Sequence, residues 1–212
     1  MIFATKILAS ATLLALIAPA QATYFAEGEP NDTLAQAQPM DPYFSLNYDP
    51  DIGEINGANT STAMSHASVL GTGDGTYDYY SFTLSDAATV ILDIDYGMPD
   101  YDSEIGLWKA DGTYITENDD YSTTAGAGGS EHQHDSFIQT SLQAGSYIVG
   151  VARFYAAGAN NGWNAISNVV PTGADYTLHA SVGQVPEAET YAMMLAGLGL
   201  VGFAASPRRL AK

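Results

Sequence analysis

The chain contains no cysteine and very few basic residues. Without cysteine it has no disulfide framework and no thiol chemistry. Lysine and arginine together number 6 against 24 aspartates and glutamates, and the formal net charge is −18. Between residues 23 and 185 only Lys109 and Arg153 are basic. This balance argues against nucleic acid and anionic lipid surfaces as partners, because both need cationic side chains to neutralise phosphate.

Familiar catalytic motifs are also missing from the sequence. There is no Gly-x-Ser-x-Gly elbow, no His-Glu-x-x-His and no phosphate loop, and the four histidines lie near no nucleophile motif. A glycosidase with two carboxylates stays open, because so many acids always offer a pair whose separation a sequence does not reveal. The sequence therefore favours a protein that is not an enzyme.

The N-terminal segment has the layout of a secretory signal peptide. A short n-region with Lys6 precedes an apolar stretch at residues 7–17, and two small-x-small sites follow at 18–20 and 20–22. We expect residues 1–22 to be a signal peptide that is removed on export.

The C-terminal segment, residues 185–212, has three parts. Val185-Pro186-Glu187 is followed by a Gly-rich apolar run and then by Arg208-Arg209. Residues 190–206, about 17 in number, would span roughly 25 Å as a helix, near the lower limit for a bilayer. The arginines would hold that end on the cytoplasmic side. We expect a transmembrane helix rather than a buried helix of a globular core, because no amphipathic face interrupts the run.

This arrangement resembles the PEP-CTERM sorting signal of bacteria, also described as an ice-binding protein C-terminal domain. Val185, Pro186, Glu187, Arg208 and Arg209 carry the resemblance, while Ala188 replaces the usual proline after the glutamate. The resemblance implies recognition by a membrane sorting enzyme of the exosortase type and cleavage near the motif. It places the protein outside a bacterium, secreted or at the cell surface, after transient anchoring in the inner membrane.

Residues 23–184 are predicted to form one all-β domain. Short segments of alternating apolar and polar residues are separated by Gly, Asp and Asn turns, which is typical of an antiparallel, jelly-roll-like β-sandwich. Asp111-Gly112 is a hairpin signal. Residues 38–66 are expected to be an irregular excursion and 121–134 a flexible glycine-rich loop. We expect the acids at the rims, on loops, and the following side chains in the core: Tyr80, Phe82, Leu92, Ile94, Leu107, Val149 and Leu178.

An acidic motif opens the domain. Glu27-Gly-Glu29-Pro-Asn31-Asp32 supplies four oxygen-bearing side chains within a bent segment, which suits a hard cation such as Ca²⁺. A further carboxylate must come from elsewhere, because so short a turn does not surround an ion alone. The alternative is a solvated acidic leader before the first strand.

Ordered motifs along the body resemble the bacterial pre-peptidase C-terminal (PPC) domain. They are the N-terminal acidic motif, Gly71 followed by Asp78-Tyr-Tyr-Ser-Phe82, Asp102 followed by Leu107-Trp108 and Asp111-Gly112, and Leu142-Gln-Ala-Gly145-Ser-Tyr147-Ile-Val149-Gly-Val151. That family is a β-sandwich, often stabilised by Ca²⁺, with binding rather than catalytic roles. The resemblance implies Ca²⁺ ligands at Glu27, Glu29, Asn31, Asp32 and Asp78. The family commonly has a further acid shortly before the residue that corresponds to Asp78, and Asp74 is the nearest candidate for it.

Other polar segments are weaker metal candidates. Asp119 and Asp120, with Asp135 across the glycine-rich loop, would suit a second cation, although a polar β-turn explains the same residues. His132 and His134 suggest zinc but lack a fixed third ligand.

An aromatic, polar loop contains Trp163, which is a candidate for stacking on a sugar ring. The leading hypothesis is an exported, non-enzymatic binding or matrix module, stabilised by Ca²⁺ and sorted to the exopolysaccharide-rich cell exterior. The alternatives are an extracellular polysaccharide hydrolase and a protein-binding adhesin.

Overall fold

The structure is a computed structural model that describes residues 24–97 and 100–184. The expected signal peptide, the sorting tail and the expected transmembrane helix at 190–206 lie outside the described residues. Within the described residues, no helix has the length and apolar character needed to cross a bilayer.

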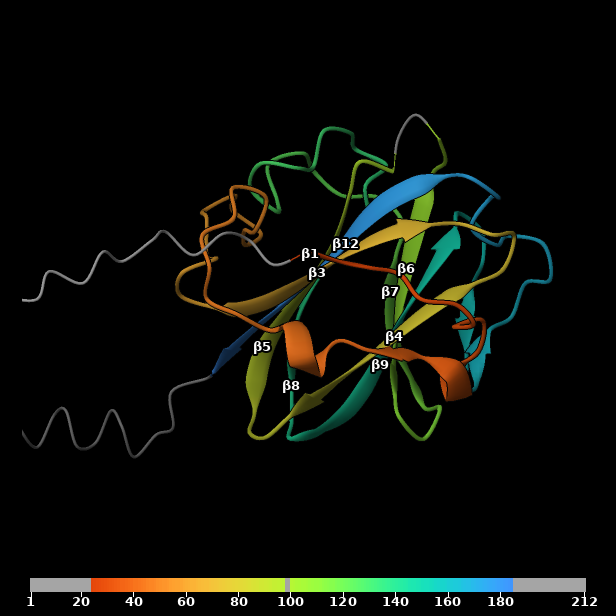
Figure 1. The fold of residues 1–212 in the computed structure, drawn as a ribbon, viewed down its shortest axis with the longest axis horizontal. Coiled ribbons are helices and arrows are strands. Elements are labelled where there is room, and N and C mark those ends of the chain that lie inside the picture. The colour runs from red at the N-terminus through yellow and green to blue at the C-terminus, as the bar shows by residue number, and fades with distance from the viewer. Residues whose placement is uncertain (1–23, 98–99, 185–212) are drawn as a thin grey trace, which may run out of the picture.

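Two five-stranded sheets pack face to face (Figure 1). The β12 sheet has the order β1 (Tyr24–Ala26), β3 (Ser65–Thr72), β12 (Asp175–Gln184), β5 (Ala88–Asp95) and β8 (Phe137–Leu142). The β9 sheet has the order β2 (Gln38–Pro39), β4 (Asp78–Leu84), β9 (Gly145–Arg153), β6 (Ser103–Lys109) and β7 (Tyr114–Asn118).

Pairing in these sheets is antiparallel except where the short strands β1 and β2 run parallel to β3 and β4. The remaining elements are a small ribbon of β10 (Gly158–Ala159) and β11 (Gly162–Trp163), and the 3-10 turns η1 (Leu34–Gln36) and η2 (Asp41–Tyr43). The predicted all-β sandwich is confirmed.

The core lies between the two sheets and consists of the inward side chains of the alternating strands. The predicted core residues are all buried there: Tyr80, Phe82, Leu92, Ile94, Leu107, Val149 and Leu178. Each large apolar side chain contributes roughly 1.5–3 kcal/mol by leaving water, so this alternation is the main source of the fold.

The hairpin predicted at Asp111-Gly112 joins β6 to β7. The Lys109 amide donates to the carbonyl of Thr113 at 2.9 Å, and Asp111 Oδ1 accepts from the amide of Thr113 at 2.9 Å. Gly112 has a φ of +85°, a conformation that favours glycine.

The excursion at residues 38–66 is irregular as predicted, apart from β2, η2 and the first residues of β3. Strand β3 itself was not predicted, although it pairs with β12 along its whole length. The sequence of β3 shows no alternation of large apolar and polar residues, because most of its positions hold small residues. Val69 and Leu70 are its large apolar side chains.

The expectation that the acids lie on loops at the rims is wrong for several of them. Asp78 opens β4, Asp93 and Asp95 lie in β5, and Glu104 lies in β6, and all four are buried. Asp93 and Asp95 occupy the face of β5 opposite to the core, because successive side chains in a strand alternate. That outer face is covered by chain, not water. In Figure 1 the part of the excursion that precedes β3 (orange loops at the left) and the 121–135 loop (green) lie on that side.

Candidate metal centre

The N-terminal acidic motif is held by hydrogen bonds to β3 and β4. The amide of Glu27, directly after β1, donates to the carbonyl of Leu70, and Glu27 Oε2 accepts from the amide of Thr72 at 2.8 Å. The carbonyl of Asn31 accepts from the amide of Tyr79 in β4 at 3.0 Å. The motif is therefore fixed beside Asp78, the first residue of β4.

The structure brings the predicted ligands together. One candidate oxygen each from Glu27, Glu29 and Asp78 lies within 4.8 Å of the others, and a second such group consists of Glu29, Asp32 and Asp74. Asn31 joins the first group, because its Nδ2 donates to Glu27 Oε1 at 2.9 Å. We call the Glu27, Glu29, Asn31, Asp32, Asp74 and Asp78 side chains the Asp78 centre.

Two oxygens of this centre are buried without a partner. The Asn31 and Asp78 residues are 0% exposed, and Asn31 Oδ1 and Asp78 Oδ1 accept no hydrogen bond. Buried polar atoms are normally paired, since leaving one unpaired costs about 1–3 kcal/mol. Carboxylate and amide oxygens are the ligands that Ca²⁺ takes, so these residues fit a hard cation.

Two tyrosines that the sequence analysis did not assign to the site complete it. Tyr176 donates to Asp78 Oδ2 at 2.7 Å, and Tyr80 donates to Glu27 Oε1 at 2.5 Å. Burial and neighbouring acidic groups raise the pKa of both phenols well above 10, so both stay protonated donors. The position of Tyr80 in the Asp78-Tyr-Tyr motif was the one feature of the sequence that could have assigned it to this site.

The electrostatics of the Asp78 centre are unfavourable without a cation. Burial, followed by the charge of Glu27, raises the pKa of Asp78 to about 8. Across residues 24–97 and 100–184 the ion pairs all use histidine as the basic partner, and none of them touches this centre. Neutralisation therefore requires a proton or a bound cation.

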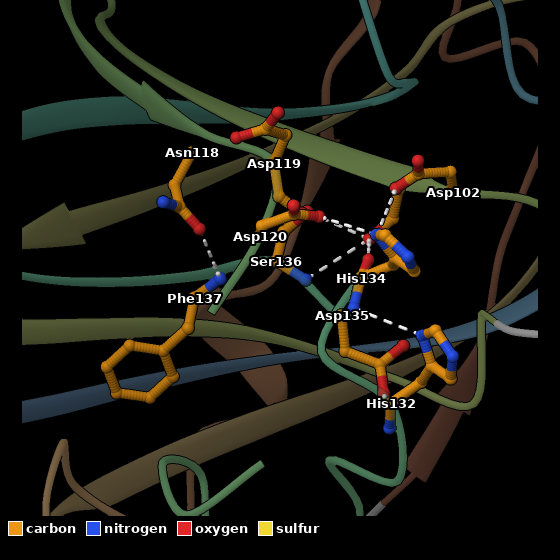
Figure 2. A network of polar contacts seen from close by, with 10 residues as sticks. Asp102, Asn118, Asp119, Asp120, His132, His134, Asp135, Ser136 and Phe137 are labelled. Carbon is orange, nitrogen blue, oxygen red and sulfur yellow. Dashed lines mark hydrogen bonds and ion pairs between the residues drawn. The ribbon is translucent and has the colours of Figure 1, made fainter. Parts of the chain in front are cut away.

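A second group, which we call the His134 cluster, consists of Asp102, Asp120 and His134, whose candidate ligand atoms lie within 4.8 Å of one another (Figure 2). His134 Nδ1 lies 2.9 Å from Asp120 Oδ1 and 3.7 Å from Asp102 Oδ1. The hydrogen bond with Asp120 raises the pKa of His134. His132 stacks on His134 with ring centroids 4.6 Å apart.

The predicted grouping of Asp119, Asp120 and Asp135 is not what the structure shows. Only Asp120 lies in the His134 cluster, and the sequence missed Asp102, which is distant along the chain. Figure 2 shows the Asp119 carboxylate pointing away from His134. Asp135 is buried and accepts from the amide of His132 at 2.9 Å.

Trp163, the predicted sugar contact, is partly buried in a cluster of aromatic rings. It packs edge-on against Trp108 with ring centroids 5.0 Å apart, and its amide donates to Tyr79 Oη. The more exposed aromatic rings of the same region belong to Phe154 and Tyr155.

Residues 184–209 match the family model of the PEP-CTERM protein-sorting motif. The tail of this chain is a PEP-CTERM sorting signal. It marks an exported protein that is sorted to the cell surface and implies recognition by an exosortase. The match covers the tail alone, so the family of the body does not follow from it.

A search of curated proteins gave no match. Among solved structures, the chain is similar to the pre-peptidase C-terminal domain of collagenase from Bacillus anthracis, at 14% identity and a TM-score of 0.33, covering 54% of this chain and 86% of that one. A cycloisomaltooligosaccharide glucanotransferase from a Paenibacillus species is 13% identical with a TM-score of 0.29, covering 74% of this chain and 24% of the enzyme.

A 4-O-methyl-α-glucuronidase with specificity for decorated arabinogalactans is 9% identical with a TM-score of 0.26, and 66% of this chain covers 17% of that enzyme. At these identities and TM-scores the likenesses assign no function to the chain. The first of them belongs to the family that the ordered motifs of the body resemble.

Proposed function

We propose that this chain is an exported, non-enzymatic surface or matrix module whose β-sandwich is stabilised by Ca²⁺ at the Asp78 centre. The observation that carries the proposal is the fully buried Asp78 carboxylate, with an unpaired oxygen and two further carboxylates in reach. The sorting signal supplies the location, the exterior of the cell, where we propose that the module contacts exopolysaccharide or matrix.

Calcium at this position would tie the N-terminal segment to the sheet. Glu27, Glu29 and Asn31 come from the segment after β1, whereas Asp78 belongs to β4. An ion shared by the two removes the repulsion among their carboxylates and adds binding free energy to folding. The structural role therefore needs no catalytic residue.

The hydrolase alternative requires two carboxylates facing each other in a groove, about 5–10 Å apart. One hollow of about 450 Å³ on the described surface is lined by Lys109, Asp111 and Tyr147 among others, and Asp111 is its only acid. The buried carboxylates at Asp78 and Asp93 lie instead inside the protein. These observations favour the binding module, and the release of reducing ends from exopolysaccharide would favour the hydrolase.

Thermal unfolding with Ca²⁺ and with chelator tests the proposal. An ion that binds only the folded state adds RT ln(1 + [L]/Kd), about 2.7 kcal/mol at a hundredfold excess over Kd. For a domain of this size we expect a rise in Tm of roughly 5–10 °C. The Glu29→Gln variant should lose most of that rise, whereas Asp86→Asn, which changes an exposed acid in the turn between β4 and β5, should keep it. A wild-type melt that chelator leaves unchanged would overturn the proposal.

A further inference from the structure

A second group of buried acids lies on the outer face of the β12 sheet, away from the Asp78 centre. Asp93 and Asp95 point outward from β5, and their exposed fractions are 3% and 0%. Residues 125–130, which we call the glycine loop, lie across them, and residues 50–54 of the excursion lie beside that loop. The loop is joined to the excursion by the amides of Gly126 and Gly128, which donate to the carbonyls of Glu54 and Pro50.

The glycines of this loop are required by the carboxylates underneath. A Cβ at Gly126 would collide with Asp93 Oδ2, and a Cβ at Gly129 would collide with Asp95 Oδ2. A Cβ at Gly128 would lie 2.7 Å from Asp51 Oδ1. The backbone thus approaches three carboxylates so closely that no side chain fits between them. This close approach is a physical reason for the glycines of a segment that was predicted, from its composition, to be a flexible loop.

The carboxylates nevertheless receive few hydrogen bonds. Asp93 Oδ2 is buried and accepts none, and the only close partner of Asp95 Oδ2 among the described residues is His179. The hydroxyl of Ser130 lies 3.5 Å from Asp93 Oδ1 and 3.3 Å from Asp95 Oδ1. The amides of Gly126 and Gly128 donate to backbone carbonyls instead, so these two glycines do not pair the aspartate oxygens that the loop covers.

One histidine contacts one of these two carboxylates. His179 Nε2 lies 3.1 Å from Asp95 Oδ2, an ion-pair distance, and His179 Nδ1 lies 2.7 Å from the hydroxyl of Ser68. Asp95 therefore has a partner, whereas Asp93 has only Ser130. Burial raises the pKa of Asp93 well above 3.8, with further contributions from the charges of Asp95 and Asp135.

We propose that Asp93 and Asp95, with the hydroxyl of Ser130, form a second site for a divalent cation of the Ca²⁺ class beneath the glycine loop. Carboxylates and a hydroxyl are oxygen ligands that such an ion accepts, and backbone carbonyls and water would complete its six to eight ligands. The bound ion would join β5 to the glycine loop, which is itself hydrogen-bonded to the excursion at Glu54 and Pro50. Calcium outside the cell would thereby order two surface segments as well as the N-terminus.

The competing account is a protonated Asp93 with no ion, and counting bound Ca²⁺ separates the two. Native mass spectrometry of the full exported chain at saturating Ca²⁺ should give one ion fewer for Asp93→Asn than for wild type. Glu29→Gln should lose a different ion, so that the double variant loses both. The control Asp86→Asn should keep the wild-type count. An Asp93→Asn variant that retains the wild-type count would overturn the second site and leave the Asp78 centre untouched.

Limited proteolysis keeps the test valid if Asp93→Asn does not fold. In the Glu29→Gln variant, Ca²⁺ should still slow cleavage within residues 121–134 several-fold relative to chelator, as mapped by peptide mass. Cleavage at the turn around Asp86 in the same sample should not respond. Equal rates of loop cleavage with Ca²⁺ and with chelator would contradict the proposal.

Discussion

The Asp78 centre and the His134 cluster both bring three ligating groups within 4.8 Å, yet they differ in what surrounds those groups. Asp78 is fully buried and keeps an unpaired oxygen, whereas Asp120 is exposed and is already paired with His134 at 2.9 Å. Asp102 Oδ1 is also buried without a hydrogen bond, but it lies 3.7 Å from the imidazole of His134, a basic group that the Asp78 centre lacks. A short distance between carboxylates therefore indicates an ion only where burial and missing partners accompany it.

The largest expected effect is the pH dependence of the metal-free protein. The folded pKa of Asp78, about 8, is raised above its unfolded value of 3.8. The stability that this group contributes is therefore fully present below pH 3.8 and is lost as the pH rises towards 8. The loss is on the order of 6 kcal/mol as an upper limit. Urea unfolding in chelator between pH 4 and 8 measures it, with Asp78→Asn as the variant whose loss should be smaller.

A flat or rising stability over that range would show that Asp78 is ionised without penalty in the metal-free fold. The reason for assigning a cation to this centre would then disappear.

An intermediate effect is expected for Asp78→Asn at neutral pH. The variant should lose the Ca²⁺-dependent stabilisation, about 2.7 kcal/mol at a hundredfold excess of Ca²⁺ over Kd. Without metal it should be at least as stable as wild type, because the asparagine avoids the cost of protonating or burying a carboxylate that is ionised in the unfolded chain. The matched substitution Asp120→Asn in the His134 cluster should change stability by less than about 1 kcal/mol and keep the Ca²⁺ response. Equal Ca²⁺ responses in wild type and Asp78→Asn would remove the distinction between the two sites.

The smallest expected effect concerns His134. Its hydrogen bond with Asp120 raises its pKa above 6.5, so Asp120→Asn should lower the pKa of the imidazole. An NMR titration of the histidine ring protons measures this shift directly. An unchanged pKa would mean that the pair is not formed in solution, and the His134 cluster would then be a free set of ligands.

Much of the sandwich follows from the sequence, because alternation reports directly which face of a strand is buried. Tyr80 with Phe82, and Leu92 with Ile94, were assigned correctly for this reason. Strand β3 lacks that signal, since its positions are mostly small residues. Asp93 lies on the outer face of β5, and alternation within one strand does not reveal that loops cover this face.

The Asp78 centre was predictable in part because most of its ligands are close in sequence. Residues 27–32 form one motif, and Asp78 was predicted as a ligand from the resemblance of the ordered motifs to the PPC family. Asp102 and Tyr176 were missed because their contacts join residues distant in the chain. Such pairings depend on the register of strands, which the composition of one segment does not encode.

The most direct test of the calcium claim is a crystal structure of the exported protein grown with Ca²⁺, with anomalous scattering used to locate the ion. The account predicts an anomalous peak at the Asp78 centre, with Asp78 Oδ1 and Asn31 Oδ1 about 2.3–2.6 Å from the ion. A structure in which these two oxygens receive ordinary hydrogen bonds, with no peak between them at saturating Ca²⁺, would contradict it.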